Sequence, residues 1–240
     1  MSLNIGTAGW SIPRDVADQF PTEGSALERY ASRFPVAEIN SSFHRSHRRS
    51  TWERWAASVP ADFRFSAKVP KTITHQHKLR DCVPLLDAFL EEVTALGPKL
   101  AVLLVQLPPK LAYDDELADR FFKDLQKRSA TPIACEPRHA SWFERDADDH
   151  LSAMHIARVA ADPACCEGAD RPGGCRNLSY WRLHGSPVKY RSSYSDRIAV
   201  YAEQLTAEAM SRETWCIFDN TASSAAGADA LALIRATAEL

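Results

Sequence analysis

Short apolar runs alternate with amphipathic segments along the whole chain. Eight of these runs have the length of β-strands, and their sequences are NIGTAG, VAEINS, FRFSAKV, LAVLLVQL, PIACEPR, IARVAAD, YWRLHG and TWCIFDN. The fourth run is almost continuously apolar, which is typical of a strand buried on both faces of a parallel sheet. The segments between the runs carry apolar residues at helical spacing. The alternation therefore predicts repeated strand–helix units and a parallel sheet.

The predicted helices have recognisable starts and apolar stripes. Ser25 with Glu28, and Ser50 with Glu53, each form a capping-box pattern. The stripes comprise residues 27–34, 52–59, 86–93 and 117–125, with weaker ones near Leu151, Tyr201 and Leu231. Eight strand–helix units in 240 residues predict an α/β fold, a single-domain (β/α)8 TIM-type barrel over residues 1–240. An open doubly wound sheet is the alternative, although GTAGW does not complete the dinucleotide fingerprint.

Polar side chains of several strands are expected to share one central space. Residues two apart on a strand share a face, so Arg64, Ser66 and Lys68 in FRFSAKV point to the barrel axis while the phenylalanines face the helices. The other polar residues expected on the inner face or at strand ends are Glu38, Asn40, Gln106, Glu136, Arg138, Asp162, Arg182, His184, Asp219 and Asn220. In this fold the carboxyl ends of the strands hold the active site. The sequence therefore predicts a polar pocket there.

A purely structural role for these charges is the competing interpretation. An unpaired buried charge is costly, so acids and bases inside a barrel tend to pair with one another. Glu38, Glu136, Arg64, Arg138 and Arg182 could form such a network without any ligand. We expect this role first for Glu38 and Arg64, which lie deeper than the residues at the carboxyl ends.

Composition and charge limit the classes of function. The formal net charge of −2 disfavours a general nucleic-acid binder, and HRSHRRS is the only basic cluster. The chain has neither a signal-peptide pattern nor about 20 consecutive apolar residues, so we expect a cytoplasmic protein without a membrane span. Six cysteines are too few for a disulfide scaffold. Cys165, Cys166 and Cys175 match no zinc or iron–sulfur spacing and indicate a variable loop.

Seven motifs carry a family resemblance, and they occur in order along nearly the whole chain. They are IGTAGW, EINSSF, FSAKVP, LLVQLPP, EPRHASW, RLHG and FDNT. With them the sequence resembles the YecE-like family, also called domain of unknown function 72. The resemblance implies a TIM-type barrel and no established activity. Where the family usually has Phe-Tyr after the second strand, this chain has Phe43 and His44, so His44 would replace a tyrosine in stacking or proton transfer.

The first functional hypothesis is an enzyme acting on a small phosphorylated or carboxylated substrate. Arginine grips such groups bidentately, and burial can tune acids and bases for proton transfer. The candidate catalytic residues are Lys68, Glu136 and His184. The candidate substrate-binding residues are Asn40, His75, Gln106, Arg138, Trp142, Arg182, Tyr190 and Asn220. Tyr190 and Tyr194 follow RLHG in a long loop that we expect to act as a lid.

Two alternatives use the same end of the barrel. No cofactor is expected by default, but Glu136, Asp162, His184 and Asp219 could hold a divalent metal for an isomerase or a phosphodiester hydrolase. Arginines two residues from two of these ligands argue against the metal because they would compete for the carboxylates. A non-catalytic module could instead bind a ligand or a nucleic-acid end, using the arginines of HRSHRRS with Trp52 as a stacking platform.

Overall fold

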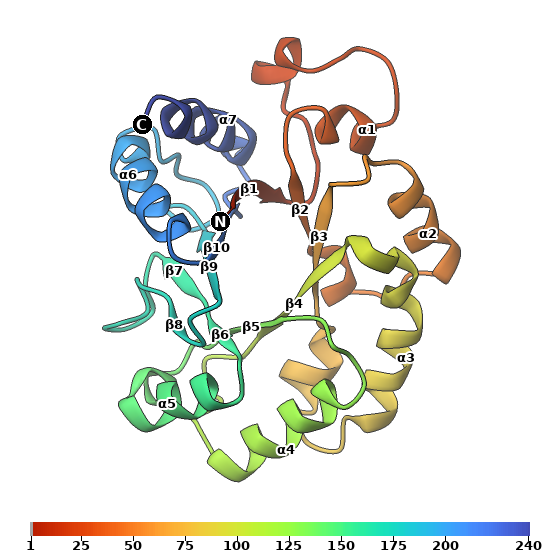
Figure 1. Cartoon of the computed structure of the whole chain (residues 1–240), viewed down its shortest axis with the longest axis vertical. Coiled ribbons are helices and arrows are strands. Elements are labelled where there is room, and N and C mark those ends of the chain that lie inside the picture. The colour runs from red at the N-terminus through yellow and green to blue at the C-terminus, as the bar shows by residue number, and fades with distance from the viewer. Residues whose placement is uncertain (1) are drawn as a thin grey trace.

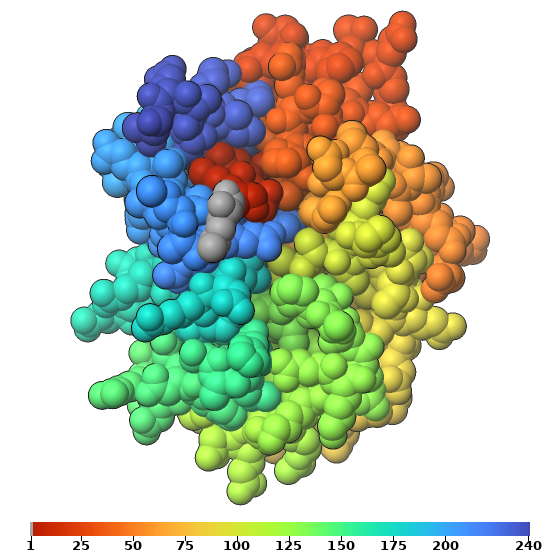
Figure 2. Space-filling view, viewed as in Figure 1, coloured from red at the N-terminus to blue at the C-terminus, as the bar shows by residue number. Residues whose placement is uncertain are grey.

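The computed structural model describes residues 2–240. Its parallel strands form a ring surrounded by helices (Figure 1). The strands of the ring are β1 Leu3–Ala8, β2 Val36–Ile39, β3 Arg64–Lys68, β4 Leu100–Gln106, β5 Ile133–Glu136, β6 Ala157–Arg158, β7 Ala160–Asp162, β9 Leu178–Leu183 and β10 Glu213–Phe218. The first and last of these pair side by side, and Figure 2 shows the N-terminal segment beside the C-terminal segments at the centre of one face.

The barrel is nearly closed by one interrupted strand. β6 and β7 belong to the same extended segment and are separated only by Val159. β6 pairs with β5, whereas β7 pairs with β9. The segment thereby joins the two ends of the sheet. The eight predicted runs are all strands, and the predicted α/β barrel is confirmed.

Helices connect most of the strands. The α-helices are α1 Ala26–Ala31, α2 Arg49–Ala57, α3 Val83–Val93, α4 Asp115–Gln126, α5 Arg145–Ala153, α6 Ile198–Ala209 and α7 Ala225–Ala238. Shorter helical turns are η1 Arg14–Gln19, η2 Ser41–Phe43, η3 Thr72–Gln76, η4 Thr94–Lys99 and η5 Ala140–Phe143. The capping box of Ser25 and Glu28 is present at α1. The one expected at Ser50 is wrong, because the N-cap of α2 is Arg48, two residues earlier, and it makes no side-chain capping bond.

Within residues 2–240, the segment between β7 and β9 lacks an α-helix, unlike the other connections. It contains β8 Gly173–Gly174, which pairs antiparallel with β6. A side chain at Gly174 would come within 2.3 Å of the Ile156 carbonyl, so glycine permits this close approach. Asp148 of α5 accepts hydrogen bonds from the Gly174 amide and from Arg158 at 2.8 and 2.7 Å. These contacts fasten the segment to the barrel.

The inside of the barrel is apolar near the amino ends of the strands and polar near the carboxyl ends. The apolar part includes Val36, Val102, Leu104, Trp215 and Ile217. Phe65 and Ala67 pack outward with the helices, while Ser66 and Lys68 face inward, as the alternation predicts. The charged residues of the inner face therefore lie next to an apolar layer that fills the amino-terminal half of the barrel interior.

Arg64 does not join these charges. It is the first residue of β3, at the amino end, and its guanidinium donates to the carbonyls of Ala61 and Phe63 at 2.8 and 3.0 Å. Its expected place in the buried network is therefore wrong. The reason is its position at the amino end of β3, whereas the charged network lies at the carboxyl ends of the strands. None of the helices in residues 2–240 combines the length and apolarity needed to cross a membrane.

Candidate functional site

Arg182 is the centre of the polar layer. This β9 residue is fully buried, and its guanidinium donates to three carboxylates. It binds Glu38 with two nitrogens at 2.7 and 3.0 Å, and it reaches Glu136 and Asp219 at 2.8 Å each. The three acids come from β2, from the end of β5 and from the residue after β10. One arginine therefore links three sides of the barrel, and its donors are engaged inside the protein.

A second ring of hydrogen bonds surrounds Glu136. The carboxylate accepts from Gln106 at 2.8 Å, from Arg138 and from Arg182. His184 lies between two acids, with Nε2 at 2.9 Å from Glu136 and Nδ1 at 2.9 Å from Asp219. Because these contacts occupy both oxygens, Glu136 acts as an anchor for its neighbours.

The acids of this network are held ionised. Burial alone would raise the pKa of Glu136, but the positive charges of Arg138 and Arg182 outweigh it and keep that pKa well below the usual range. The pKa of Asp219 is lowered as well, because Arg182 and His184 outweigh its burial. A carboxyl group held this way is a weak acid–base catalyst near neutral pH. The geometry therefore gives Glu136 a positioning role.

A cavity of about 290 Å³ opens above this network. We call it the rim pocket. Its lining includes His75 after β3, Gln106 and Arg138 at the ends of β4 and β5, and Lys189 and Tyr190 after β9. All five follow or end a strand at its carboxyl end, so segments far apart in the sequence meet at one rim.

Lys68 lies near His75, one of the residues that line the rim pocket, but is not itself part of that lining. It is the last residue of β3 and is 5% exposed. Its register partner on β4 is Leu104, one inward-facing position below Gln106. Its ammonium lies 4.1 Å from the centre of the Phe43 ring, which in turn contacts the His75 ring.

No hydrogen bond or ion pair joins the ammonium of Lys68 to a side chain in residues 2–240, and its contact is with the Phe43 ring. The nearby acids are already engaged by Arg182. Burial, together with the positive charge of Arg182, lowers the pKa of Lys68 to about 8. The neutral fraction of this amine at physiological pH is therefore larger than that of an ordinary lysine.

His75 and Arg138 present unused polar atoms to the rim pocket. Nδ1 of His75 is 2.9 Å from the Thr74 hydroxyl, which leaves Nε2 for a ligand. Burial and the charges of Lys68 and Arg138 lower the pKa of His75, so its imidazole is neutral at pH 7. Arg138 uses only Nη2 in its contacts with Glu136 and His184. Its Nε and Nη1 remain available as donors within the described chain.

Three of the expected substrate-binding residues have other surroundings. Trp142 is buried beneath the loop after β5, where its indole donates to the Leu111 carbonyl at 2.9 Å. Asn220 is fully buried and donates to Ser192 and to Asp229 of α7, so it fastens the loop after β9. Arg182 is enclosed by acids, as described above. Asn40 stays at the end of β2 with a buried Oδ1 that has no partner among residues 2–240.

The four-residue metal set is not assembled. Glu136, His184 and Asp219 are in contact, but Asp162 is bound by Arg197 at 2.7 Å and by the Tyr201 hydroxyl on the side of α6. Its position on β7 turns the carboxylate outward, away from the other three. No cluster of three or more metal-ligating side chains occurs in the part of the chain that the structure describes.

The loop after β9 contributes one wall of the rim pocket. Tyr190 is 42% exposed and its ring packs edge-on against His184. Tyr194 is fully buried, and its hydroxyl donates to the Asp162 carbonyl and accepts from the Gly185 amide. Tyr194 therefore anchors the loop, while Tyr190 and Lys189 face the cavity. Sequence reasoning missed Lys189, although its place in the predicted lid loop was a usable signal.

Other residues noted in the sequence lie elsewhere. His44 lines a separate small cavity on the far side of Phe43, between α2 and α3. Trp52 is fully buried, so it offers no stacking platform. Cys165 lines the rim pocket and is next to Cys166, with 3.7 Å between the sulfurs. Cys175 is buried at the other end of the barrel.

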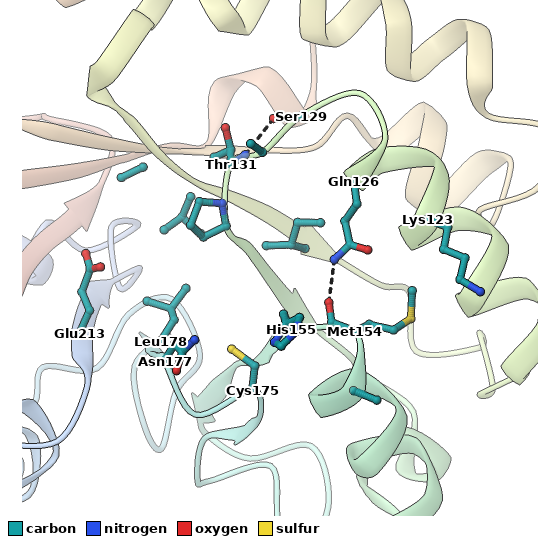
Figure 3. Close-up of a pocket in the computed structure, with 16 residues that line it drawn as sticks. Lys123, Gln126, Ser129, Thr131, Met154, His155, Cys175, Asn177, Leu178 and Glu213 are labelled. Carbon is teal, nitrogen blue, oxygen red and sulfur yellow. Dashed lines mark hydrogen bonds between the residues drawn. The ribbon is translucent and has the colours of Figure 1, made fainter.

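A larger cavity, about 670 Å³, lies at the amino ends of the strands (Figure 3). Ile133 and Leu178, which begin β5 and β9, are in its lining. Gln126 spans part of it with a hydrogen bond to the Met154 carbonyl. The catalytic end of this fold is the opposite one, so size alone does not make this cavity the active site.

Together, the ring of parallel strands and the polar rim define a TIM-type barrel with a candidate ligand pocket at the catalytic end. Residues 4–239 match the family described as "Protein of unknown function DUF72". The chain therefore belongs to the DUF72 family.

Named relatives and solved structures agree with this assignment. The UPF0759 protein YecE of Escherichia coli K12 is 35% identical over 106 residues, which make up 44% of this chain and 38% of the relative. UPF0759 protein YunF of Bacillus subtilis 168 is 28% identical over 150 residues, 59% of this chain and 52% of the relative. The matches thus span about half or less of those relatives.

DUF72 proteins of known structure share the fold. The structure from Enterococcus faecalis V583 matches with a TM-score of 0.84 at 21% identity, covering 99% of this chain and 96% of the other. The one from Thermotoga maritima MSB8 matches with a TM-score of 0.81 at 19% identity, covering 98% of each chain. At these identities the likeness shows the barrel fold.

Because Arg182 pairs with three carboxylates, removing its charge should lower the stability of the fold more than removing the charge of Arg138. We expect Arg182→Met to lower the free energy of unfolding by about 3–5 kcal/mol, because three buried carboxylates lose their shared cation. Arg138→Met is the matched control, and we expect a smaller loss of about 1–3 kcal/mol because Arg182 still neutralises Glu136. Urea unfolding of the two variants measures the difference. Equal losses would contradict the central place of Arg182.

Acid should destabilise the protein through the same carboxylates. Because the folded pKa of Glu136 is lowered, its contribution to stability is present above the unfolded pKa of about 4.3 and is lost as the pH falls. Between pH 4 and 3 we expect the slope of unfolding free energy against pH to be smaller in Glu136→Gln than in wild type, by up to about 1.4 kcal/mol per unit. The control Glu53→Gln alters an exposed pair. A Glu136→Gln slope equal to wild type would refute the assignment.

Proposed function

We propose that this protein is an enzyme that acts on a small anionic substrate, phosphorylated or carboxylated, in the rim pocket. The observation that carries the proposal is a pair of cationic groups with unused donors, Lys68 and the Nε and Nη1 atoms of Arg138. The other central charges of the barrel are paired inside it. Donors that the protein itself does not engage are suited to an anion from outside.

Arg138 fits the role of anion receptor. Its contacts with Glu136 and His184 engage Nη2 and leave Nε and Nη1 as donors. Each of these nitrogens can donate a charge-assisted hydrogen bond to an oxygen of a carboxylate or phosphate. Lys189 lines the same cavity and adds a second positive charge. Gln106 is already fixed by Glu136 and can orient a substrate through its carbonyl oxygen.

The size of the rim pocket restricts the substrate. Its volume of about 290 Å³ is at the lower end of ligand-binding cavities, which run from about 300 to 1,000 Å³. A water molecule has a share of about 30 Å³ in the liquid. The pocket therefore suits a metabolite of a few carbon atoms with one anionic group, and it is too small for a nucleic-acid strand.

The lowered pKa values of Lys68 and His75, which lie near Arg138, favour catalysis over binding alone. Lys68, with a pKa of about 8, and His75, whose pKa is lowered by burial and nearby cations, both change protonation without extreme conditions. We assign the chemical step to these two residues. Glu136 takes a positioning role because it is buried and accepts a hydrogen bond from Arg138, and His184 is buried between Glu136 and Asp219. A binding module would gain nothing from a buried amine poised near neutrality.

Calorimetric titration with small anions tests the proposal. We expect inorganic phosphate, pyruvate or glycerol 3-phosphate to bind, and Arg138→Met to weaken the best of them at least tenfold, the loss expected for a charged hydrogen-bond pair. Arg171→Met, which changes an exposed arginine outside the rim pocket, should bind as wild type does. The proposal fails if none of these anions binds, or if Arg138→Met binds the best of them as tightly as wild type.

A further inference from the structure

The surroundings of Lys68 are unusual for a lysine that serves only as a charge. A structural lysine inside a protein is normally met by a carboxylate, since an unpaired buried ammonium is costly. Here each nearby acid is taken by another donor: Glu38 by Arg182 and Tyr180, and Asp219 by Arg182 and His184. The amine instead meets the face of Phe43. The protein thus keeps a largely buried primary amine without a hydrogen-bond partner in residues 2–240, near a residue that lines the rim pocket.

A neutral primary amine in such a place is a nucleophile. Desolvation and a neighbouring cation are the two devices that activate lysine toward carbonyl carbons. Both apply here: the side chain is 5% exposed, and Arg182 lies close enough to disfavour the ammonium form. His75 stands beside Phe43 with a free ring nitrogen, which supplies a proton carrier for the same step.

We propose that Lys68 forms an imine with an aldehyde or ketone that carries a carboxylate or phosphate group held by Arg138. This inference rests on the proposed function and names the substrate class of that site. The anionic group would fix the substrate by its far end, while the carbonyl carbon extends past His75 toward the amine.

The chemical step balances without a cofactor. The lone pair of the neutral Lys68 amine attacks the carbonyl carbon, the C=O π electrons move to oxygen, and His75 carries one proton from the nitrogen to that oxygen. A second proton, which His75 takes from water, converts the hydroxyl group into a leaving water molecule, and the nitrogen lone pair closes the C=N bond. The net change is one amine, one carbonyl and one proton giving one protonated imine and one water. The protonated imine withdraws electrons, so His75 can next remove a proton from the adjacent carbon to give an enamine.

Reductive trapping tests the imine directly. The purified protein is incubated with pyruvate or glyceraldehyde 3-phosphate in the presence of sodium cyanoborohydride, which converts an imine into a stable secondary amine. Peptide mapping by mass spectrometry then locates the adduct. We expect modification of Lys68 by at least one of the two probes, with little at Lys189, the matched lysine of the same pocket. The trapping rate should rise with pH through about 8, as the amine loses its proton.

Two variants complete the test. Lys68→Arg should abolish trapping while calorimetry still shows binding of the anionic probe, because the arginine keeps the charge but is not a nucleophile. Arg138→Met should slow trapping at least tenfold at a fixed probe concentration, whereas Arg171→Met should not. If the probes bind but no adduct forms at Lys68, the imine is refuted and the anion site stands. If adducts appear mainly on Lys189 or surface lysines, the imine at Lys68 is refuted as well. If no anion binds, the proposed function itself fails.

Discussion

The pairing of Arg182 with three carboxylates, those of Glu38, Glu136 and Asp219, is the constraint on which the carboxyl half of the barrel depends. These side chains come from distant parts of the chain and meet with little access to water. A single guanidinium satisfies them because its planar nitrogens reach several carboxylates at once. Without it the three negative charges would repel one another in a poorly solvated space. The network therefore both closes the polar layer and fixes its side chains in place.

The proposed function depends on the cationic groups that this network does not fully engage. Because Arg182 and His184 occupy the acids, Lys68 has no carboxylate to neutralise it, and its ammonium is destabilised by burial and by Arg182. Because Glu136 holds Arg138 by one nitrogen, Nε and Nη1 of that guanidinium are left as donors in a residue that lines the rim pocket. The same interactions that stabilise the barrel thus prepare an amine and an anion receptor. Structural and chemical roles are divided between neighbouring residues of one layer.

The sequence could predict the level and face of these residues but not their partners. Alternation in FRFSAKV and YWRLHG places Lys68 and His184 on the inner face because a strand has a period of two. It could not tell that Arg182 would be enclosed, since pairing depends on which strands are neighbours across the barrel. Asp162 was misjudged because its strand is interrupted and turns the carboxylate outward toward α6. Lys189 lies in a loop, where no periodicity indicates which side chain enters the cavity.

The most direct measurement of the central claim is the protonation of Lys68 itself. An NMR titration that follows the side-chain ¹³Cε signal, assigned with Lys68→Arg, reports this group alone. The account predicts a midpoint near pH 8, below the pKa of about 10.4 that is usual for lysine. A midpoint above 10 would show that the amine is paired or solvated, and it would contradict the view that the Arg182 network leaves a lysine poised for chemistry.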